Sequence, residues 1–196
     1  HGVNIVFGGK VIAGTRAKKE RSKSYNAFSS INSPDIAVIQ DRRIIFYIDD
    51  RSRVRERVRF YHGMDSRVFL LKLIPGMDGR IRHRMAEDYD AVIIESFGVG
   101  GLPSYGEQNF QDAIDIWCQK GRKVIMATQV THEGSDMEIY QVGKSIKERF
   151  PVVEAFDMTL EATVTRTMWL LGTGAKGEAF EAGFYRTINH DILLAE

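Results

Sequence analysis

Residues 91–103 read Ala-Val-Ile-Ile-Glu-Ser-Phe-Gly-Val-Gly-Gly-Leu-Pro, an apolar run of strand length followed by a glycine-rich turn. Similar apolar runs occupy residues 68–74 and 124–128. These runs lack the alternation of a half-buried strand, and they are typical of parallel strands that are buried on both faces of a sheet. The segments between them are long enough for helices. The pattern therefore predicts an α/β layer domain over residues 67–196.

Two helices are expected to pack on this sheet. The spacing i, i+3, i+4, i+7 of one helix face is shared by four apolar residues: Phe110, Ala113, Ile114 and Trp117. A last helix is expected from about residue 159 to 171, because the side-chain oxygen of Asp157 or Thr159 can accept a hydrogen bond from a free amide of its first turn.

Residues 1–66 have a different character. Gly8-Gly9 separates two short apolar runs, which predicts a two-residue hairpin within the first 14 residues. Small and hydroxyl residues dominate positions 22–34 and predict a packed loop with at most short helical turns. Residues 44–50 are strand-like. They are followed by alternating arginines, which a period of two places on one face of an extended connector: Arg51, Arg53, Arg55, Arg57 and Arg59.

Composition excludes several classes of protein. The 196 residues are 43% hydrophobic and 27% charged, as in ordinary globular proteins. No apolar run approaches the ~18 residues of a membrane span. The single cysteine, Cys118, excludes an internal disulfide, so the cytoplasm is the expected location. Cys118 follows Trp117 in a predicted helix and is interpreted as a packed small residue. A strand pattern begins directly after His1, so we expect the chain to be part of a longer protein.

Two loops are candidates for a binding site, because the carboxyl ends of parallel strands meet at one edge of a sheet. Residues 98–103 follow one buried strand, and residues 128–136 follow the next. Thr128, Glu133 and Ser135 are able to hold an amino group or an amide. The alternative is a tight turn and a solvated loop without a ligand. No metal site is predicted, because His132 and Glu133 have no third ligand at a suitable spacing.

Basic residues offer a second set of candidates. Lys18 and Lys19 follow a predicted strand. They are either surface charges or, if placed beside an acid or hydroxyl, groups that take part in catalysis. The arginine connector at 51–59 is either a phosphate-binding face or a solvated or partner-paired one.

These segments together resemble bacterial L-asparaginases of the cytoplasmic, type I kind, in the same order and over essentially the whole chain. The blocks that carry the resemblance are IVF (5–7) with VIAGTRAKK (11–19), AFSSINSP (27–34), ESFGVGGLP (95–103), ATQ (127–129), EG (133–134) and FDMTLEA (156–162). The resemblance implies a C-terminal α/β domain at 67–196, with a small parallel sheet flanked by helices. Residues 1–45, a hairpin and a loop, would end a larger N-terminal α/β domain, and residues 46–66 would connect the two.

The resemblance also implies an activity. The family hydrolyses the side-chain amide of L-asparagine to L-aspartate and ammonia, without metal or organic cofactor, as homodimers or homotetramers. Its threonine nucleophile lies in a Thr-Gly-Gly-Thr motif and is supported by a His-Gly-Thr-Asp-Thr motif; neither occurs in this chain. The family's lysine corresponds to Lys19. This chain alone is therefore expected to be inactive.

Further residues follow from the family's other sites. Gly100 and Gly101 lie in the loop that contacts substrate across the dimer interface, with Gly101 where many relatives carry Asn. A possible effector pocket involves Thr128 and Glu133, together with Glu95 and Val130 in place of the arginine and cysteine of some relatives. The alternative function is a non-catalytic module of the same fold that binds a small molecule or docks a subunit. Nucleic-acid binding through residues 51–59 is a third hypothesis, and neither nucleic acid nor a membrane is the expected partner.

Overall fold

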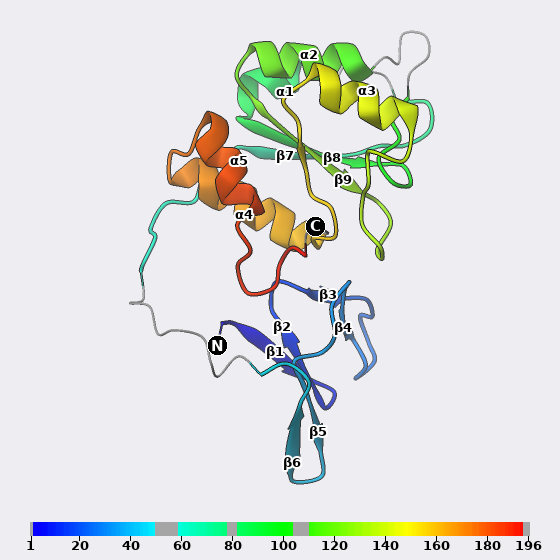
Figure 1. The fold of residues 1–196 in the computed structure, drawn as a ribbon, viewed down its shortest axis with the longest axis vertical. Helices are drawn as coiled ribbons and strands as arrows, with labels where there is room; N and C mark the ends of the chain where they lie inside the picture. The colour runs from blue at the N-terminus through cyan, green and yellow to red at the C-terminus, as the bar shows by residue number, and fades with distance from the viewer. Residues whose placement is uncertain (1, 50–58, 78–81, 104–109, 194–196) are drawn as a thin grey trace.

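A computed structural model describes residues 2–49, 59–77, 82–103 and 110–193 (Figure 1). Its larger part is built on a parallel sheet with the order β10-β9-β8-β7. The strands are β7 (Val68–Lys72), β8 (Ala91–Ser96), β9 (Lys123–Thr128) and β10 (Val153–Glu154). The first three confirm the predicted strands, but only β8 and the four central residues of β9 are buried; β7 lies at the sheet edge and only its Leu71 is buried. No helix in the described ranges is long and apolar enough to cross a membrane.

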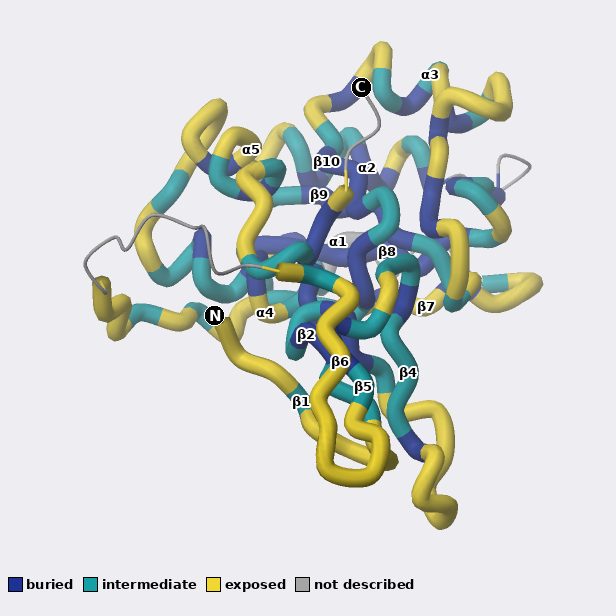
Figure 2. The backbone as a smooth tube through the Cα atoms, turned by 60° about the horizontal axis from the view of Figure 1, so that its bottom comes forward, coloured by how far each residue is buried: buried dark blue, intermediate teal, exposed yellow. Residues whose placement is uncertain are grey.

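Helices cover both faces of the sheet (Figure 1). One face carries α1 (Arg82–Asp88), α2 (Phe110–Gln119) and α3 (Gln141–Arg149); the other carries α4 (Leu160–Gly172) and α5 (Gly177–Tyr185). Along β8, Val92 and Ile94 join the core beneath α2, whereas Ile93 joins the core beneath α5. This alternation explains why the strand is apolar at every position from 91 to 94. The dark blue tube of β8 and β9 in Figure 2 shows the same burial.

The helix predictions are partly confirmed. All four residues of the predicted apolar face are buried in α2, and α4 occupies the predicted position with Thr159 as its N-cap. The expectation that this helix is the last one is wrong, because α5 follows it. Phe180 and Phe184, one helical turn apart, pack α5 into the core beneath the sheet.

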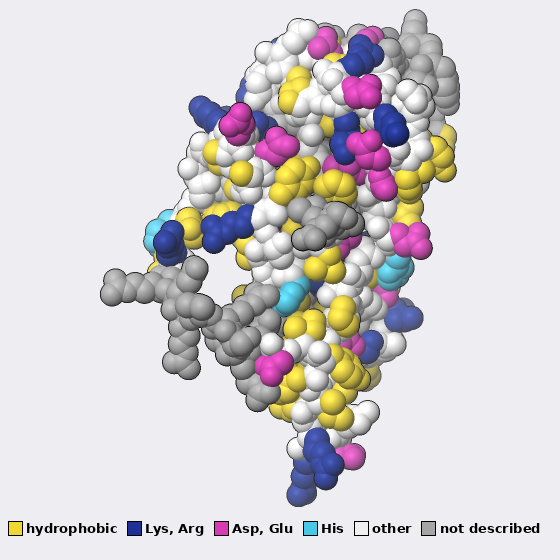
Figure 3. Space-filling view, viewed as in Figure 1, with side chains coloured by type: hydrophobic (Ala, Val, Ile, Leu, Met, Phe, Trp, Pro, Cys, Tyr) yellow, Lys and Arg dark blue, Asp and Glu magenta, His cyan; other side chains and the backbone are white. Residues whose placement is uncertain are grey.

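The N-terminal strands form two smaller sheets. An antiparallel sheet has the order β1-β2-β5-β6, and β3 pairs with β4. The bounds are β1 (Asn4–Phe7), β2 (Lys10–Ala13), β3 (Ala17–Lys19), β4 (Phe28–Ser30), β5 (Ala37–Gln40) and β6 (Arg43–Phe46). Hydrophobic side chains gather on the surface of this part of the molecule (Figure 3).

The predicted hairpin is confirmed. Phe7 faces Lys10 across a two-residue turn in which Gly8 and Gly9 take φ values of 59° and 78°, which glycine adopts without strain. The packed loop predicted at 22–34 instead contains strand β4, because its hydroxyl residues pair with β3. The prediction of an arginine face falls on residues 51–57, which lie outside the described residues, and on Arg59, which is exposed and in no helix or strand.

A fully buried arginine joins the N-terminal strands to the parallel-sheet domain. Arg16, which precedes β3, donates hydrogen bonds to the backbone oxygen of Asp157 (2.7 Å), to Asp157 Oδ2 (2.7 Å) and to the backbone oxygen of His190. Next to it, Thr15 donates to the backbone oxygen of Asn189 at 2.6 Å. These contacts hold the start of β3 against the N-terminus of α4 and the segment 187–193.

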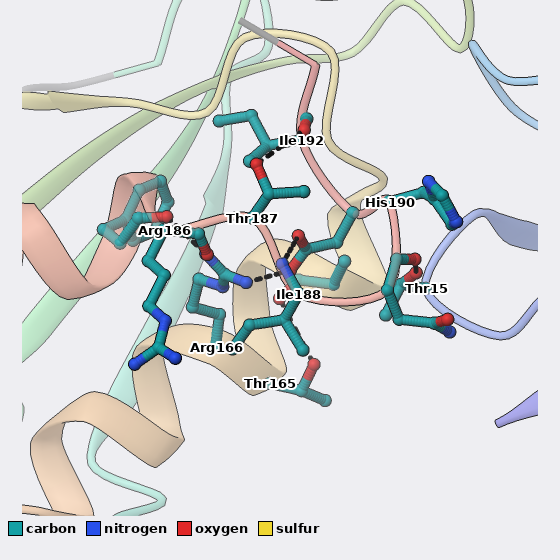
Figure 4. Close-up of polar contacts among 12 residues, drawn as sticks. Thr15, Thr165, Arg166, Arg186, Thr187, Ile188, His190 and Ile192 are labelled. Atoms are coloured by element: carbon teal, nitrogen blue, oxygen red, sulfur yellow. Dashed lines mark hydrogen bonds and ion pairs between the residues drawn. The ribbon is translucent and has the colours of Figure 1, made fainter. Parts of the chain in front are cut away.

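A second buried arginine fixes that segment to α4 (Figure 4). Arg166 donates to the backbone oxygens of Phe184 (2.5 Å) and Arg186 (2.6 Å), and its guanidinium pairs with Asp191. Burial raises the pKa of Asp191 and lowers the pKa of Arg166. The turn at Ile188 is closed by its amide, which donates to Asp191 Oδ1 at 2.7 Å.

Replacing the N-cap Thr159 by Ala should lower the free energy of unfolding by about 1–2 kcal/mol. The hydroxyl accepts a hydrogen bond from the amide of Ala162 (3.1 Å) and donates one to the backbone oxygen of Thr15 (2.9 Å). Thr159→Ser should keep both bonds and most of the stability. Thr165→Ala, on the exposed face of α4, should cost less than about 0.5 kcal/mol in the same urea titration. Equal losses at 159 and 165 would contradict the capping role.

Candidate active site

Lys19 ends strand β3 and is exposed. It pairs with Phe28 of β4, and its ammonium lies over the Phe28 ring, 5.9 Å from the centroid. Phe28 in turn contacts Phe7 of β1 edge to face, with 5.3 Å between the ring centroids. The Lys19 amine thus stands at the surface at the end of a row of two aromatic rings.

Lys18 points to the other side, since neighbouring residues of a strand face opposite ways. Its side chain lines a small polar pocket between β3 and the carboxyl ends of β8 and β9, and its ammonium lies 3.5 Å from Thr131 Oγ1. The pocket has a volume of about 30 Å³, which is room for one or two water molecules. The side chains of the two adjacent lysines therefore lie on opposite sides of β3.

Three residues of the predicted effector pocket do line this pocket: Glu95, Thr128 and Val130. Glu95 is almost fully buried at the end of β8, with Lys72 Nζ 3.9 Å from its carboxylate. The Thr128 hydroxyl donates to the backbone oxygen of Gly98 and accepts from the amide of Val130 at 3.0 Å. It ties the glycine loop to the end of β9.

Glu133 is not among the lining residues. It adopts a φ of 71°, and its amide donates to the Asn32 side chain at 2.8 Å. Asn32 itself lines the pocket and also donates to the backbone oxygen of Asp157 at 3.0 Å. The contribution of Glu133 is therefore to position Asn32, a residue that the sequence did not single out for chemistry.

Gln129 is a further residue that the sequence pattern did not single out by itself. Its side-chain amide donates to the backbone oxygens of Leu73 (2.7 Å) and Glu95 (3.0 Å). These bonds join the ends of β7, β8 and β9 just beside the pocket. No local signal marked this role, because both acceptors belong to residues at the ends of other strands.

Gly100 and Gly101 lie in the turn after β8, outside the pocket lining. The amide of Gly101 donates to the backbone oxygen of Phe97 at 2.7 Å, which closes the turn. Gly100 has a φ of 135°, and a Cβ atom there would come within 2.9 Å of Met137 Cγ. A side chain at position 100 would be strained by this φ and would have to displace the Met137 side chain, so the backbone conformation favours glycine there.

The remaining candidate residues of the sequence analysis are Cys118, Ser135 and the possible metal ligands. Burial in α2 raises the pKa of Cys118 to about 11, as expected of a packed thiol that carries little thiolate at neutral pH. Ser135 is buried, but its hydroxyl has no hydrogen-bond partner among the described residues. Across the described ranges, no group of three His, Cys, Asp or Glu side chains is arranged to hold a metal ion.

Comparison with known proteins identifies two matching families. Residues 67–184 match the family described as Glutaminase/Asparaginase C-terminal domain, and residues 1–52 match the one described as Asparaginase, N-terminal. The two matches lie on the parallel-sheet domain and on the N-terminal strands, respectively.

Individual relatives agree with these matches. An L-asparaginase of Thermococcus kodakarensis is 33% identical over 87% of this chain and 51% of its own length. A glutamyl-tRNA(Gln) amidotransferase subunit of Thermoplasma acidophilum is 28% identical over 83% of this chain and 38% of its own length. The chain thus spans about half the length, or less, of these relatives.

Solved structures show the same fold. The thermostable L-asparaginase of Thermococcus kodakarensis superposes with a TM-score of 0.85 at 31% identity, covering 99% of this chain and 58% of that one. L-asparaginase I of Vibrio cholerae superposes with a TM-score of 0.86 at 20% identity, covering 98% of this chain and 57% of that one.

Proposed function

Because the chain belongs to the glutaminase/asparaginase family, we propose that it is part of an L-asparaginase. The reaction is hydrolysis of the side-chain amide of L-asparagine to L-aspartate and ammonia. The observation that carries the proposal is Lys19: its amine stands exposed at the end of β3, on a strand whose start is fixed by the buried Arg16. A relative named L-asparaginase, 33% identical over 87% of this chain, supports it.

In this proposal, Lys19 moves a proton for a hydroxyl nucleophile. A threonine hydroxyl is a weak nucleophile at neutral pH and needs a neighbouring base to take its proton. Lys19 relays that proton when the nucleophile and an aspartate are held beside its amine. Neither threonine motif of the family occurs in these 196 residues. The nucleophile therefore belongs to a segment outside this sequence, and this chain alone is inactive.

The finer assignments are part of the proposal. Residues 1–45 form the last part of a larger catalytic domain, and residues 67–196 form the C-terminal domain. Residues 46–66 connect the two domains. The protein is a cytoplasmic enzyme of the bacterial type I kind, and it works as a homodimer or homotetramer. It uses no cofactor or metal, and it binds neither nucleic acid nor a membrane. Gly100 and Gly101 contact substrate across the dimer interface. The buried position of Gly100 beside Met137, with a φ of 135° that favours glycine, supports a fixed shape for that loop.

The pocket of Glu95, Thr128 and Val130 is proposed as the place where the amino group of a small effector enters, because its volume of about 30 Å³ holds only a group of that size. Glu95 supplies a carboxylate that favours an amino group, and Lys18 supplies a cation at the same pocket. Glu133 acts through its backbone by holding Asn32.

The test is ammonia release from L-asparagine by this chain alone and by the complete gene product, each as wild type and as Lys19→Ala. We expect activity in the complete wild-type protein only, and a loss of at least about 100-fold in kcat for Lys19→Ala, the usual size of a proton-transfer contribution. Lys144→Ala, which removes an exposed lysine of α3 outside both candidate sites, is the control and should keep kcat. Activity of this chain alone, or full activity of Lys19→Ala, would contradict the proposal.

A second candidate is a component of an amidotransferase. It is favoured by the relatives named as glutamyl-tRNA(Gln) amidotransferase subunits, which are 25–29% identical. Ammonia release from an amide that requires both a partner protein and tRNA would favour the amidotransferase over the free-standing asparaginase.

A further inference from the structure

A second cavity lies at the amino ends of the parallel strands, whereas the pocket of Glu95 and Thr128 lies at their carboxyl ends. Its volume of about 690 Å³ is within the range of small-molecule sites. On one side, Arg67 directly precedes β7, Asp90 directly precedes β8, and Lys123 begins β9. On the other side are the end of α4 and the turn that leads into α5 (Figure 1). This amino-edge cavity is lined by six charged residues: Asp65, Arg67, Asp90, Arg122, Lys123 and Lys176.

Four of these charges are paired with one another. Arg67 forms ion pairs with Asp65, at 3.1 Å, and with Asp90. Arg122 also pairs with Asp90, and it donates a hydrogen bond to the backbone oxygen of Ala86 at 2.9 Å. The two arginines and two aspartates therefore hold each other in place at the ends of three strands, and together they add no net charge to the cavity.

The two lysines add charge that is not balanced in this way. In the part of the chain that the structure describes, neither Lys123 nor Lys176 forms an ion pair. The Lys123 ammonium lies over the buried ring of Phe180, 5.1 Å from its centroid, and Lys176 is exposed directly before α5. A ring face attracts a cation but carries no net charge. Glu178, in the first turn of α5, is not part of the lining. With four basic and two acidic side chains, the lining has a net charge of +2.

The turn between α4 and α5 leaves room beside these charges. Gly174 and Gly177 both line the cavity with positive φ values, and a Cβ atom at either position would meet no atom within 4 Å. Leu171 and Ala175 add a small apolar surface to the same wall. The cavity thus combines an excess of positive charge with carboxylate acceptors and an apolar strip.

This combination favours a phosphate monoester as ligand. Such a group carries a charge of about −1.5 to −2 near neutral pH and has several acceptor oxygens, so it balances the excess charge and accepts hydrogen bonds from ammonium groups. A free phosphate ion would fill only a small part of a cavity of about 690 Å³, and we therefore expect an organic group on the phosphate. Hydroxyl groups of the ligand can donate hydrogen bonds to the carboxylates of Asp65 and Asp90.

We propose that the amino-edge cavity binds a small phosphorylated compound that carries hydroxyl groups, of the class of sugar phosphates and nucleoside monophosphates. Lys123 and Lys176 bind its phosphate, and Asp65 and Asp90 accept hydrogen bonds from its hydroxyl groups. Open α/β sheets usually bind ligands at the carboxyl ends of their strands. This site is at the other end, so it is separate from the pocket of Glu95 and does not depend on the proposed hydrolysis of asparagine.

The experiment titrates the complete gene product with ribose 5-phosphate and with adenosine monophosphate in a calorimeter. Ribose and adenosine are the matched compounds without phosphate. We expect one site per chain for at least one of the two phosphates, with a Kd at least about tenfold lower than that of its matched compound, because the phosphate forms charge-assisted hydrogen bonds. The phosphate that binds more tightly identifies the organic group.

Variants of the two lysines connect the binding to this cavity. Lys176→Gln and, independently, Lys123→Gln should each raise Kd by at least about tenfold. Lys144→Gln is the matched control: it changes the net charge equally, but Lys144 is an exposed residue of α3 on the other face of the sheet, and Kd should stay unchanged. Because Lys176 is exposed, Lys176→Gln should keep the urea midpoint of the wild type, which separates a loss of binding from a loss of folding.

Several outcomes would overturn the inference. They are no binding of either phosphate, equal binding of the compounds with and without phosphate, or a Kd that both lysine variants leave unchanged. Succinate that binds more tightly than either phosphate, and is lost in Lys176→Gln, would assign the cavity to dicarboxylates. Retention of tRNA that Lys176→Gln abolishes, without binding of either phosphate, would assign the surface to nucleic acid.

Ammonia release from L-asparagine by the wild-type protein is read separately. Its absence would contradict the proposed function and leave the phosphate site standing, whereas ammonia release without phosphate binding would do the reverse.

Discussion

Arg16→Met should lower the free energy of unfolding by about 3–5 kcal/mol, the usual cost of removing one partner of a buried ion pair. The Arg16 side chain is fully buried, and the Asp157 side chain is 16% exposed. Methionine keeps the alkyl stem but removes all donors. The carboxylate of Asp157 and the backbone oxygens of Asp157 and His190 would each lose a hydrogen bond.

The measurement is urea denaturation of the isolated chain, with two further variants. Arg16→Lys should recover part of the lost stability, because an ammonium restores the charge but cannot form all three hydrogen bonds of the planar guanidinium. Arg67→Met removes an arginine that is 62% exposed and pairs with Asp65 at 3.1 Å and with Asp90; such surface pairs each contribute less than about 1 kcal/mol. A loss at Arg16 no larger than that at Arg67 would show that the junction is not held by this side chain.

Arg166→Met should also cost about 3–5 kcal/mol near neutral pH. The guanidinium and the Asp191 carboxylate are only 3% and 4% exposed. Without the arginine, the backbone oxygens of Phe184 and Arg186 lose their donor, and the carboxylate stays buried without this countercharge. The helix α4 and the segment 187–193 would then separate more easily.

The loss at Arg166 should depend on pH. Burial already raises the pKa of Asp191, and Arg166 is one of the groups that lower it. The variant should therefore have a still higher Asp191 pKa. A carboxyl with a raised pKa in the folded state stabilises below its ordinary pKa and loses that contribution as pH rises through the raised value. In urea titrations the deficit should be smaller at about pH 5 than at about pH 7.5. A deficit that is equal at both values would show that Asp191 is not the group left unpaired.

The fold was predictable where burial on both sides leaves a local pattern. Strands β8 and β9 each have four consecutive apolar residues, at 91–94 and 124–127, and α2 repeats its apolar residues at helical spacing. Strand β4 was not predictable, because its residues are mostly small and polar and its conformation depends on pairing with β3. Helix α5 was missed because only Phe180 and Phe184 mark its buried face, and because glycines occupy its first position, 177, and position 183.

The site was predictable only in part. Glu95, Thr128 and Val130 come together because parallel strands end at one edge, which follows from the fold class. Lys19 was assigned by resemblance, and its role remains a proposal. Nothing local marked Arg16 as a buried residue, since its partners Asp157 and His190 lie 141 and 174 positions away.

That separation has a consequence for how the molecule is made. Contacts between residues so far apart close large loops, and folds that depend on them form slowly. During synthesis Arg16 leaves the ribosome long before Asp157 and His190, so these acceptors are absent while most of the chain is being translated. The parallel sheet can assemble earlier from nearer segments. The strand that carries Lys19 is therefore expected to reach its final orientation in a late step, after residues 157–190 have been translated.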